Sequence, residues 1–392
     1  MSLPPQTVAC PESSDPQAES PVVVRELSGR RELGLFLRLP WTIYADDPAW
    51  APPLLAERRL FVNRAQHPFF GHGSAAFFLA FRDRQVVGRI CVSDDPRYNA
   101  HHRVNQGCVG LFESIDDEAV AHALFNASAD WLRARGRDQI VGPIDYSTNY
   151  TCGLLIDGFQ TPPRVMMNHH PAYYQALWES WGFGKAKDLY GWWFDDPHDM
   201  ASSWREKAQR LVRRCGITIR AFRLNDFAGD VRRCLQVYNE AWRDNWGAVP
   251  MTDAESLHLA KNLRRWADPE LLLIAEAEGR PVGFCLTLPD FNEAMRPLNG
   301  RLFPLGWLRF ARNLKRIKTG RVLTCGVVDQ YRRRGVTDLM ILRTLEYGKH
   351  VRGFDNAELG WTLEDNALIN RTIETVGGKR YKTYRIYERT LE

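Results

Sequence analysis

The chain has 392 residues, of which 44% are hydrophobic and 25% are charged. This composition is typical of a globular protein and excludes a largely disordered chain. The length exceeds that of one ordinary domain and predicts two. A net charge of +5 is small for this length and gives no reason to expect a nucleic-acid partner.

The cysteines and the N-terminal residues indicate the cellular compartment and the kinds of site to expect. The eight cysteines are scattered, without a Cys-x-x-Cys pair or a zinc-type histidine spacing. We therefore expect reduced thiols in a cytoplasmic protein, and no metal site. Residues 1–20 are rich in Pro, Ser, Glu and Gln and are predicted to be a disordered tail without a signal peptide. The sequence has no run of about 18 apolar residues, so we expect no membrane span.

Residues 21–195 carry the pattern of a first α/β domain. Residues 77–81 and 86–92 are strand-like and flank a short polar turn, which predicts a hairpin. Further strands are predicted at residues 107–113, 140–143 and 189–194, and helices at residues 116–135 and 173–181.

A polar cluster in this first half is a candidate substrate site. It begins with Asp145, Tyr146 and Asn149 and continues with the run Asn168-His169-His170. Tyr146 and His170 are the substrate-binding candidates. Adjacent histidines point in different directions, so a metal site is not expected here. A structural or interface role explains the cluster about as well.

A linker near residues 195–216 is predicted to lead into a second domain, residues 217–392. Thr252 and Glu255 have the spacing of a capping box, which predicts a helix start. Asp365 and Asn366 open another helix. The remaining predicted elements are strands at residues 217–220, 271–276, 281–288, 322–328, 358–361 and 381–387, and helices at residues 226–246 and 337–351.

Residues 292–320 interrupt this second domain and carry a basic, aromatic pattern. Phe303, Trp307, Phe310, Leu314 and Ile317 recur at helical spacing, and residues 301–321 contain no acidic side chain. The combination is typical of an amphipathic helix that lies on an anionic membrane surface. A helix that packs its aromatic face on the protein core is the equally weighted alternative.

The most informative stretch joins the strand at residues 322–328 to the helix at residues 337–351. It reads Gln-Tyr-Arg-Arg-Arg-Gly-Val-Thr at residues 330–337. A loop that enters a helix N-terminus directs several backbone N–H groups at one point, where the helix dipole attracts anions. Three consecutive arginines add positive charge. The loop is therefore a candidate pyrophosphate site, and a solvated basic turn is the alternative.

This segment resembles the acyl-CoA-binding core of the GNAT N-acyltransferase superfamily. The family's loop pattern is Arg/Gln-x-x-Gly-x-Gly/Ala, and its fixed positions are occupied by Arg332, Gly335 and, as a departure, Thr337. The order of elements also matches the family. The resemblance implies an α/β fold of two GNAT-like mixed-sheet domains in tandem, with helices on both faces. An unrelated first domain is the alternative.

Only the second half has a loop suited to acyl-CoA. The counterpart in the first half, residues 112–118, has no glycine and carries four acidic residues, which would repel a pyrophosphate. The resemblance implies acyl-CoA as co-substrate at the second loop alone. The cofactor-binding candidates are Gly326, Val327, Val328, Arg332, Arg333, Arg334, Gly335, Val336, Thr337, Asn366 and Asn370. For Asn366, capping its helix is the simpler role.

Acyl transfer to an amine needs a base that leaves the amine neutral when it attacks. Asp290 ends a predicted strand and is the first candidate, because site residues commonly lie at strand ends. Glu240 and Glu358 are the other two, and each of the three is alternatively a surface carboxylate or a helix cap. Cys325 is a candidate covalent acyl acceptor, although a buried thiol is the simpler interpretation.

Three further positions complete the predicted site. Trp242 and Asn292 are substrate-binding candidates beside Tyr146 and His170. Members of the family often carry a tyrosine that donates a proton to the leaving thiolate. Ile373 stands at that position here, so this role is vacant or filled from elsewhere.

The whole chain is similar to bacterial tandem-GNAT proteins, including those of the ceramide synthase type. The resembling segments are residues 238–246, 250–252, 289–292, 326–335 and 384–388. The resemblance implies transfer of a long-chain acyl group from acyl-CoA to the amine of a sphingoid base, by a cytoplasmic protein that lies peripherally on the inner membrane face. The alternatives are a soluble acetyltransferase for a small polar amine and a non-catalytic acyl-CoA-binding protein.

Overall fold

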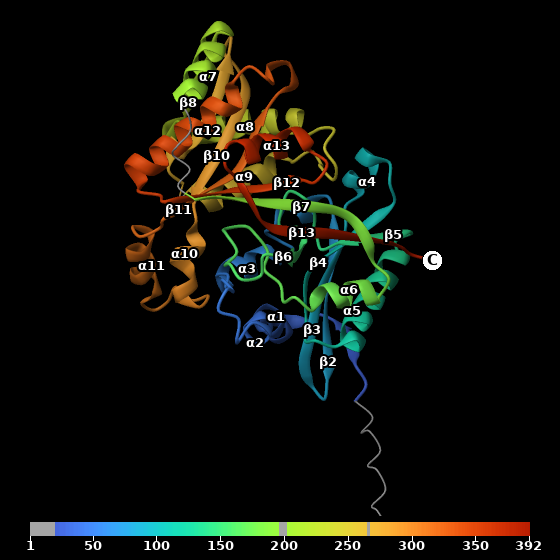
Figure 1. Ribbon diagram of the computed structural model, residues 1–392. Coiled ribbons are helices and arrows are strands. Elements are labelled where there is room, and N and C mark those ends of the chain that lie inside the picture. Colours follow the sequence, from blue (N-terminus) through green and yellow to red (C-terminus); the bar gives the residue numbers. More distant parts are fainter. Residues whose placement is uncertain (1–19, 196–201, 265–266) are drawn as a thin grey trace, which may run out of the picture.

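The computed structural model describes residues 20–195, 202–264 and 267–392 (Figure 1). The predicted tail, except for its last residue, lies outside these ranges, as do residues 196–201 of the predicted linker. The described strands form one 13-stranded mixed sheet in the order β1-β2-β3-β4-β5-β13-β7-β12-β11-β10-β9-β8, with β6 paired to β13 away from this path.

The first half supplies one end of this sheet and the helices around it. The predicted hairpin, the later strands and the two helices are confirmed, and short elements before the hairpin are added to them. The bounds are β1 (Val23–Glu26), α1 (Gly29–Arg38), α2 (Pro40–Ile43), α3 (Leu55–Phe61), β2 (Ser74–Arg82), β3 (Gln85–Asp94), α4 (Pro96–His102), β4 (Gln106–Ser114), α5 (Glu118–Arg133), β5 (Gln139–Gly142), β6 (Leu154–Asp157), α6 (Tyr174–Ser180) and β7 (Gly184–Asp195).

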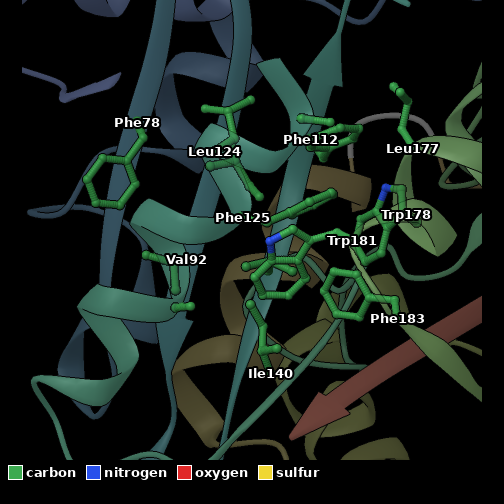
Figure 2. Close-up of a cluster of buried hydrophobic side chains, with 14 of the residues drawn as sticks. Phe78, Val92, Phe112, Leu124, Phe125, Ile140, Leu177, Trp178, Trp181 and Phe183 are labelled. Atoms are coloured by element: carbon green, nitrogen blue, oxygen red, sulfur yellow. The ribbon is translucent and has the colours of Figure 1, made fainter. Parts of the chain in front are cut away.

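Alternation along β2 explains why helices cover both faces of this part of the sheet. Successive side chains of a strand point to opposite faces. Phe78 belongs to the buried cluster that contains Phe125 of α5, whereas its neighbour Phe77 belongs to the cluster that contains Phe36 of α1. Figure 2 shows the first of these clusters, in which Phe125 lies among the rings of Phe112, Trp178, Trp181 and Phe183.

The second half supplies the other end of the sheet. Its predicted strands and helices are confirmed, and the Thr252–Glu255 capping box forms with both reciprocal hydrogen bonds. The bounds are α7 (Ser202–Arg214), β8 (Ile217–Ala221), α8 (Phe227–Ala241), α9 (Asp253–Arg264), β9 (Leu272–Ala277), β10 (Arg280–Pro289), α10 (Phe291–Met295), α11 (Gly306–Leu314), β11 (Thr319–Val327), α12 (Val336–Tyr347), β12 (Asn356–Leu363), α13 (Ala367–Thr375) and β13 (Lys379–Thr390).

The two halves exchange their last strands. β7 ends the first half but pairs with β12 of the second, whereas β13 ends the chain but pairs with β5 of the first. β7 and β13 also pair with each other along most of their length, from Lys379 opposite Trp193 to Glu388 opposite Gly184. Figure 1 shows both strands crossing the middle of the molecule. The sheet is therefore continuous through the junction of the halves.

The insertion forms a small lobe rather than one continuous helix. α10 and α11 pack on each other and lie beside the start of β11, at one side of the molecule (Figure 1). Phe310 and Ile317 of the predicted aromatic face are buried in a cluster with Val165 of the first half. Phe303 and Trp307 are instead exposed. In the described part of the chain, no helix has the length and hydropathy needed to span a membrane.

Candidate functional site

A gap between two neighbouring strands lies at the centre of the second half. β11 and β12 run parallel and pair only from Thr319 opposite Asn356 to Val322 opposite Leu359. Beyond Val322 the two strands separate, although β11 continues to Val327. The edge of β11 from residue 323 to residue 327 therefore lacks a partner strand among the described residues. Apart from the Val327 carbonyl oxygen, which accepts from Arg332, the backbone groups on this edge are available to an extended ligand that pairs as an added strand does.

Trp242 covers this open stretch of β11 from one side. A Cβ atom on Gly326 would lie 2.2 Å from the Trp242 ring, so only glycine allows so close an approach. The ring stacks on Tyr238 with centroids 5.0 Å apart and also contacts Phe284. The structure thus brings two of the predicted site residues, Trp242 and Gly326, into direct contact beside the open edge.

The basic loop follows directly after the open edge. Gly335 has a φ of +76° and forms the N-cap of α12, with no side-chain cap hydrogen bond. The first-turn N–H groups of a helix have no partner within the helix. A Cβ atom on Gly335 would also lie 3.1 Å from the backbone oxygen of Ala208 in α7. A glycine at residue 335 is therefore required both by the positive φ and by the close packing against α7. Helix α7 lies in the segment that was predicted to be a linker.

The three arginines of the loop differ in their contacts and exposure. Arg332 donates to the carbonyl oxygens of Val327 and Ala241 at 3.2 and 2.8 Å, so its side chain ties the end of β11 to the end of α8. Arg333 and Arg334 are exposed, and the Arg334 guanidinium lies over the Tyr331 ring. The uncapped helix start and two exposed guanidinium groups fit the diphosphate of an acyl-CoA.

Reversing both exposed charges is expected to weaken acyl-CoA binding. In the variant Arg333→Glu/Arg334→Glu, we expect the KM for acyl-CoA to rise by at least roughly tenfold, because each charge-assisted bond to a phosphate contributes about 1.5–3 kcal/mol. The KM for the amine is expected to stay within twofold. Arg371→Glu, at an exposed position of α13, is the matched control. Unchanged affinity for CoA would rule out the loop as the diphosphate site.

The corresponding gap in the first half is filled by the chain itself. The backbone N–H of Ile144 donates to Val109 of β4 at 2.7 Å, and the Asp145 carboxylate accepts from Leu111 N at 2.9 Å. Glu113 is not in the loop but buried, where it accepts hydrogen bonds from Tyr44 and Tyr174. A filled gap and an acidic loop both support a single acyl-CoA site, in the second half.

A buried ion network lies where β11 and β12 begin to separate. Arg321 and Glu358 are opposite each other in the register and form an ion pair at 3.1 Å. Glu358 also accepts from the Tyr381 hydroxyl at 3.2 Å. A second pair joins Arg164 of the first half to Asp290 at 3.1 Å. Two of the three predicted bases, Asp290 and Glu358, thus belong to one network.

Burial and the neighbouring guanidinium groups shift the pKa values of the two carboxyl groups in opposite directions. Burial, the larger effect, raises the pKa of both Asp290 and Glu358. Asp290 also accepts from the N–H groups of Val165 and Asn292, and so caps α10. The third candidate, Glu240, is exposed on α8 and is not part of the network. The structure therefore buries Asp290 and Glu358 beside the paired part of β11, before the open edge begins.

Cys325 lies opposite Cys285 on the paired strands β11 and β10. A hydrogen bond with the Cys285 thiol, together with burial, raises the pKa of Cys325 above its ordinary value. The reactive form of cysteine is the thiolate. A raised pKa disfavours the thiolate and so argues against Cys325 as an acyl acceptor, and its side chain is a half-buried thiol.

Three predicted substrate-binding residues, Tyr146 and His170 of the polar cluster and Asn292 of the insertion, make hydrogen bonds within the protein. Tyr146 is buried and donates to the carbonyl of Phe61 at 3.1 Å. His170 accepts from Leu155 N through Nδ1, and burial lowers its pKa to about 3. Asn292 donates to Pro163 O at 2.8 Å and so joins the insertion to the first half. Their contacts are structural.

Helix α13 has capping and anchoring contacts at the two predicted asparagines. Asn366 forms the N-cap and accepts from Ile369 N. Asn370 is buried, accepts from Thr362 and donates to the carbonyl oxygen of Leu363. Ile373, where the family often has a tyrosine, is buried beside Gly378. The side chains of α13 therefore supply contacts to β12 and no proton donor at that position.

Two relatives match nearly the whole chain. A protein of Caulobacter vibrioides named bacterial ceramide synthase is 37% identical over 370 residues, which are 92% of this chain and 95% of that protein. This chain belongs to the bacterial ceramide synthase family. The Escherichia coli protein named YghO is 35% identical over 374 residues, 94% of this chain and 95% of that protein. No protein-family model matches the chain.

Solved structures show the fold of this family. A tandem GNAT protein from the clavulanic acid biosynthesis pathway aligns with a TM-score of 0.58 at 11% identity, covering 95% of this chain and 99% of that chain. A GCN5-related N-acetyltransferase from Sphaerobacter thermophilus aligns with a TM-score of 0.53 at 17% identity, covering 95% and 96%. The prediction of two GNAT-like units in tandem is confirmed.

Arg164 and Arg321, the cationic half of the ion network, were not predicted from the sequence. Arg321 and Glu358 are charged residues inside otherwise apolar strands, and such interruptions signal a buried pair. Arg164 comes from an irregular segment of the first half, and no local pattern marks it. Among the described residues, no cluster of His, Cys, Asp and Glu has a geometry that would hold a metal ion.

Proposed function

We propose that this protein transfers a long-chain acyl group from acyl-CoA to the amine of a sphingoid base and so forms ceramide. The observation that carries the proposal is the 37% identity to the Caulobacter vibrioides protein named bacterial ceramide synthase, over 92% of the chain. The open edge of β11, the uncapped start of α12 and the exposed face of α11 support it from the structure.

The chemistry proposed for the open edge is direct acyl transfer. The thioester carbonyl accepts hydrogen bonds from backbone N–H groups of β11, which stabilise the oxyanion that forms when the amine attacks. A C–N bond forms, the C–S bond breaks, and the CoA thiol leaves with the proton that the amine loses. Asp290 and Glu358, whose pKa values burial raises, are the proposed proton acceptors.

The proposed substrate requires access to a membrane, and α11 offers a surface for it. Phe303 is 82% exposed and Trp307 is 50% exposed, next to exposed Leu305 and Leu308. The same segment carries the exposed basic residues Arg301, Arg309, Arg312, Lys315, Arg316 and Lys318. A basic residue near an anionic leaflet contributes about 1 kcal/mol. We propose peripheral, reversible attachment at the cytoplasmic face of the membrane.

A chain-length series tests the proposed function. The substrates are acyl-CoA thioesters from two to eighteen carbons, with sphinganine or a small polar amine as the acceptor. Each buried methylene contributes about 0.8 kcal/mol, so four methylenes alone favour the longer chain by roughly 200-fold. We expect kcat/KM to rise accordingly with chain length and only with sphinganine. A preference for acetyl-CoA and the small amine would refute the proposal, as would the absence of turnover with every pair.

A further inference from the structure

A glycine marks the point where β11 and β12 separate. The last residues that pair across these two strands are Val322 and Leu359. A Cβ atom on Gly360, the next residue of β12, would lie 3.1 Å from the carbonyl oxygen of Val322 and 3.0 Å from that of Leu323. Such contacts are tighter than a side chain normally allows, so the glycine lets the two backbones approach each other here. The open edge of β11 begins directly after this contact.

Both strands also have an irregular register at this point. β11 has one extra residue, Leu323, relative to β10, and β12 has two residues, Gly360 and Trp361, opposite one residue of β7. Irregularities of this kind redirect the side chains beside them and are frequent next to active sites. Leu323 and Trp361 are both half-buried, so part of their apolar surface is accessible to a ligand.

Trp361 lies on the face of the sheet opposite to α12. Along β7, the partners of Leu359 and Leu363 are three residues apart, so these two side chains of β12 point to opposite faces. Leu359 packs against the cluster that contains Met340 of α12. Leu363 and Trp361 pack instead against the cluster that contains Leu189. A ligand with its diphosphate at the start of α12 and its thioester at the open edge would therefore continue on the face where Trp361 lies.

The first half adds two consecutive methionines to this apolar lining. Met166 packs against the same cluster as Leu323, and Met167 packs against the same cluster as Trp361. Both methionines are half-buried, and their flexible side chains adapt to the shape of an apolar ligand. The φ of Met166 is +62°, a left-handed conformation that is rare for such residues and is concentrated at ligand sites. The segment therefore connects the apolar side chains on the two sides of the gap.

We propose that Trp361, Leu323 and the two methionines bind the acyl chain of the thioester, and that Trp361 sets the preference for a long chain. The chain would leave the thioester at the open edge and lie along the Trp361 ring, with Leu323 and Met167 beside it. These side chains carry no charged group that a hydrocarbon chain would desolvate, so affinity rises with each methylene that is buried. The inference rests on the proposed function and extends it, because it assigns the choice of acyl chain to named residues.

Equilibrium binding in the absence of an acceptor tests this site. The probes are octanoyl-CoA and acetyl-CoA, which differ only in the length of the acyl chain, titrated against the full chain by calorimetry. We expect the wild type to bind octanoyl-CoA at least roughly tenfold more tightly than acetyl-CoA, and Trp361→Ala to reduce that ratio to about threefold or less. Affinity for acetyl-CoA should change by less than about twofold, which also shows that the variant is folded. Met167→Ala is the second variant and is expected to lower the ratio about threefold. Trp131→Ala, at a half-buried tryptophan of α5, is the matched control and should keep the wild-type ratio.

Steady-state kinetics with sphinganine distinguish the acyl-chain site from the proposed function. Trp361→Ala is expected to lower kcat/KM for octanoyl-CoA about tenfold and that for acetyl-CoA less than about twofold. Turnover of long-chain thioesters with an octanoyl-to-acetyl ratio that neither variant alters would overturn the acyl-chain site and leave the proposed function standing. An equal loss of affinity for both thioesters in Trp361→Ala would overturn the site as well, because the ring would then contact the CoA part of the ligand. Binding of octanoyl-CoA that depends on Trp361, without amide formation by the wild type, would refute the proposed function and support the site.

Discussion

Replacing Arg321 with methionine is expected to lower the free energy of unfolding by about 3–5 kcal/mol, because removal of one partner leaves the other charge buried and unpaired. Arg321 is 2% exposed and Glu358 is fully buried, so water cannot take the place of the lost partner. Tyr381 would remain as a neutral donor to Glu358. Denaturant titration of the wild type and the variant measures the difference.

A double variant distinguishes the loss of the Arg321–Glu358 ion pair from other effects of substituting residue 321. Arg321→Met/Glu358→Gln removes both charges, and we expect it to recover most of the stability that Arg321→Met loses. Lys379→Met is the matched control, since the Lys379–Asp195 pair is 71% and 60% exposed and such pairs contribute about 1 kcal/mol or less. Equal losses in the single and double variants would contradict the pairing.

The pair also bears on the chemistry of the open edge. If Glu358 serves only as the counterion of Arg321, the double variant should recover turnover together with stability. If Glu358 accepts a proton during acyl transfer, the double variant should regain stability while kcat stays low. This split between stability and kcat distinguishes a structural carboxylate from a base.

The second large effect is expected at the membrane-facing helix. The variant Phe303→Glu/Trp307→Glu replaces two exposed aromatic side chains with acidic ones, without disturbing a packed contact of the core. Burial of a large apolar side chain contributes about 1.5–3 kcal/mol, and each acidic residue also opposes an anionic surface. We expect partitioning onto vesicles of phosphatidylglycerol to fall at least roughly a hundredfold.

The choice of positions and control follows from the structure. Phe310 belongs to the same helical pattern in the sequence but is buried, so changing it would test the core rather than the surface. Leu368→Glu on α13, where the side chain is 61% exposed, is the matched control and should leave partitioning unchanged. Partitioning of the double variant at the wild-type level would exclude α11 as the attachment surface.

Periodicity and turn chemistry were sufficient to predict most of the elements. The Thr252–Glu255 capping box and the glycine at residue 335 depend on a few neighbouring residues, and both are found as expected. The exchange of β7 and β13 was not predicted, because an alternating apolar pattern specifies a strand without specifying its neighbour. The polar sequence of α7 predicts a linker, because its packing face is apparent only once α12 is in place.

The same distinction, between features set by neighbouring residues and features set by distant ones, applies to the candidate site. The basic loop could be predicted because its residues are consecutive and the physics of a helix start is local. The ion network could be predicted only in part, since Asp290 and Glu358 were identified by type while Arg164 reaches Asp290 from 126 residues away in the chain. A cleft lined by Trp41, Asp47 and Glu293 could not be predicted, because these residues meet only through the packing of the insertion against the first half.

The exchanged strands make the two halves parts of a single folding unit. A fragment that ended after β7 would lack β13, leaving β5 with an open edge and β7 without either of its neighbours. Open edges of this kind pair with other chains and promote aggregation. Neither half is therefore expected to fold when it is produced or exchanged alone. A gene that encodes this architecture has to keep both halves in one reading frame.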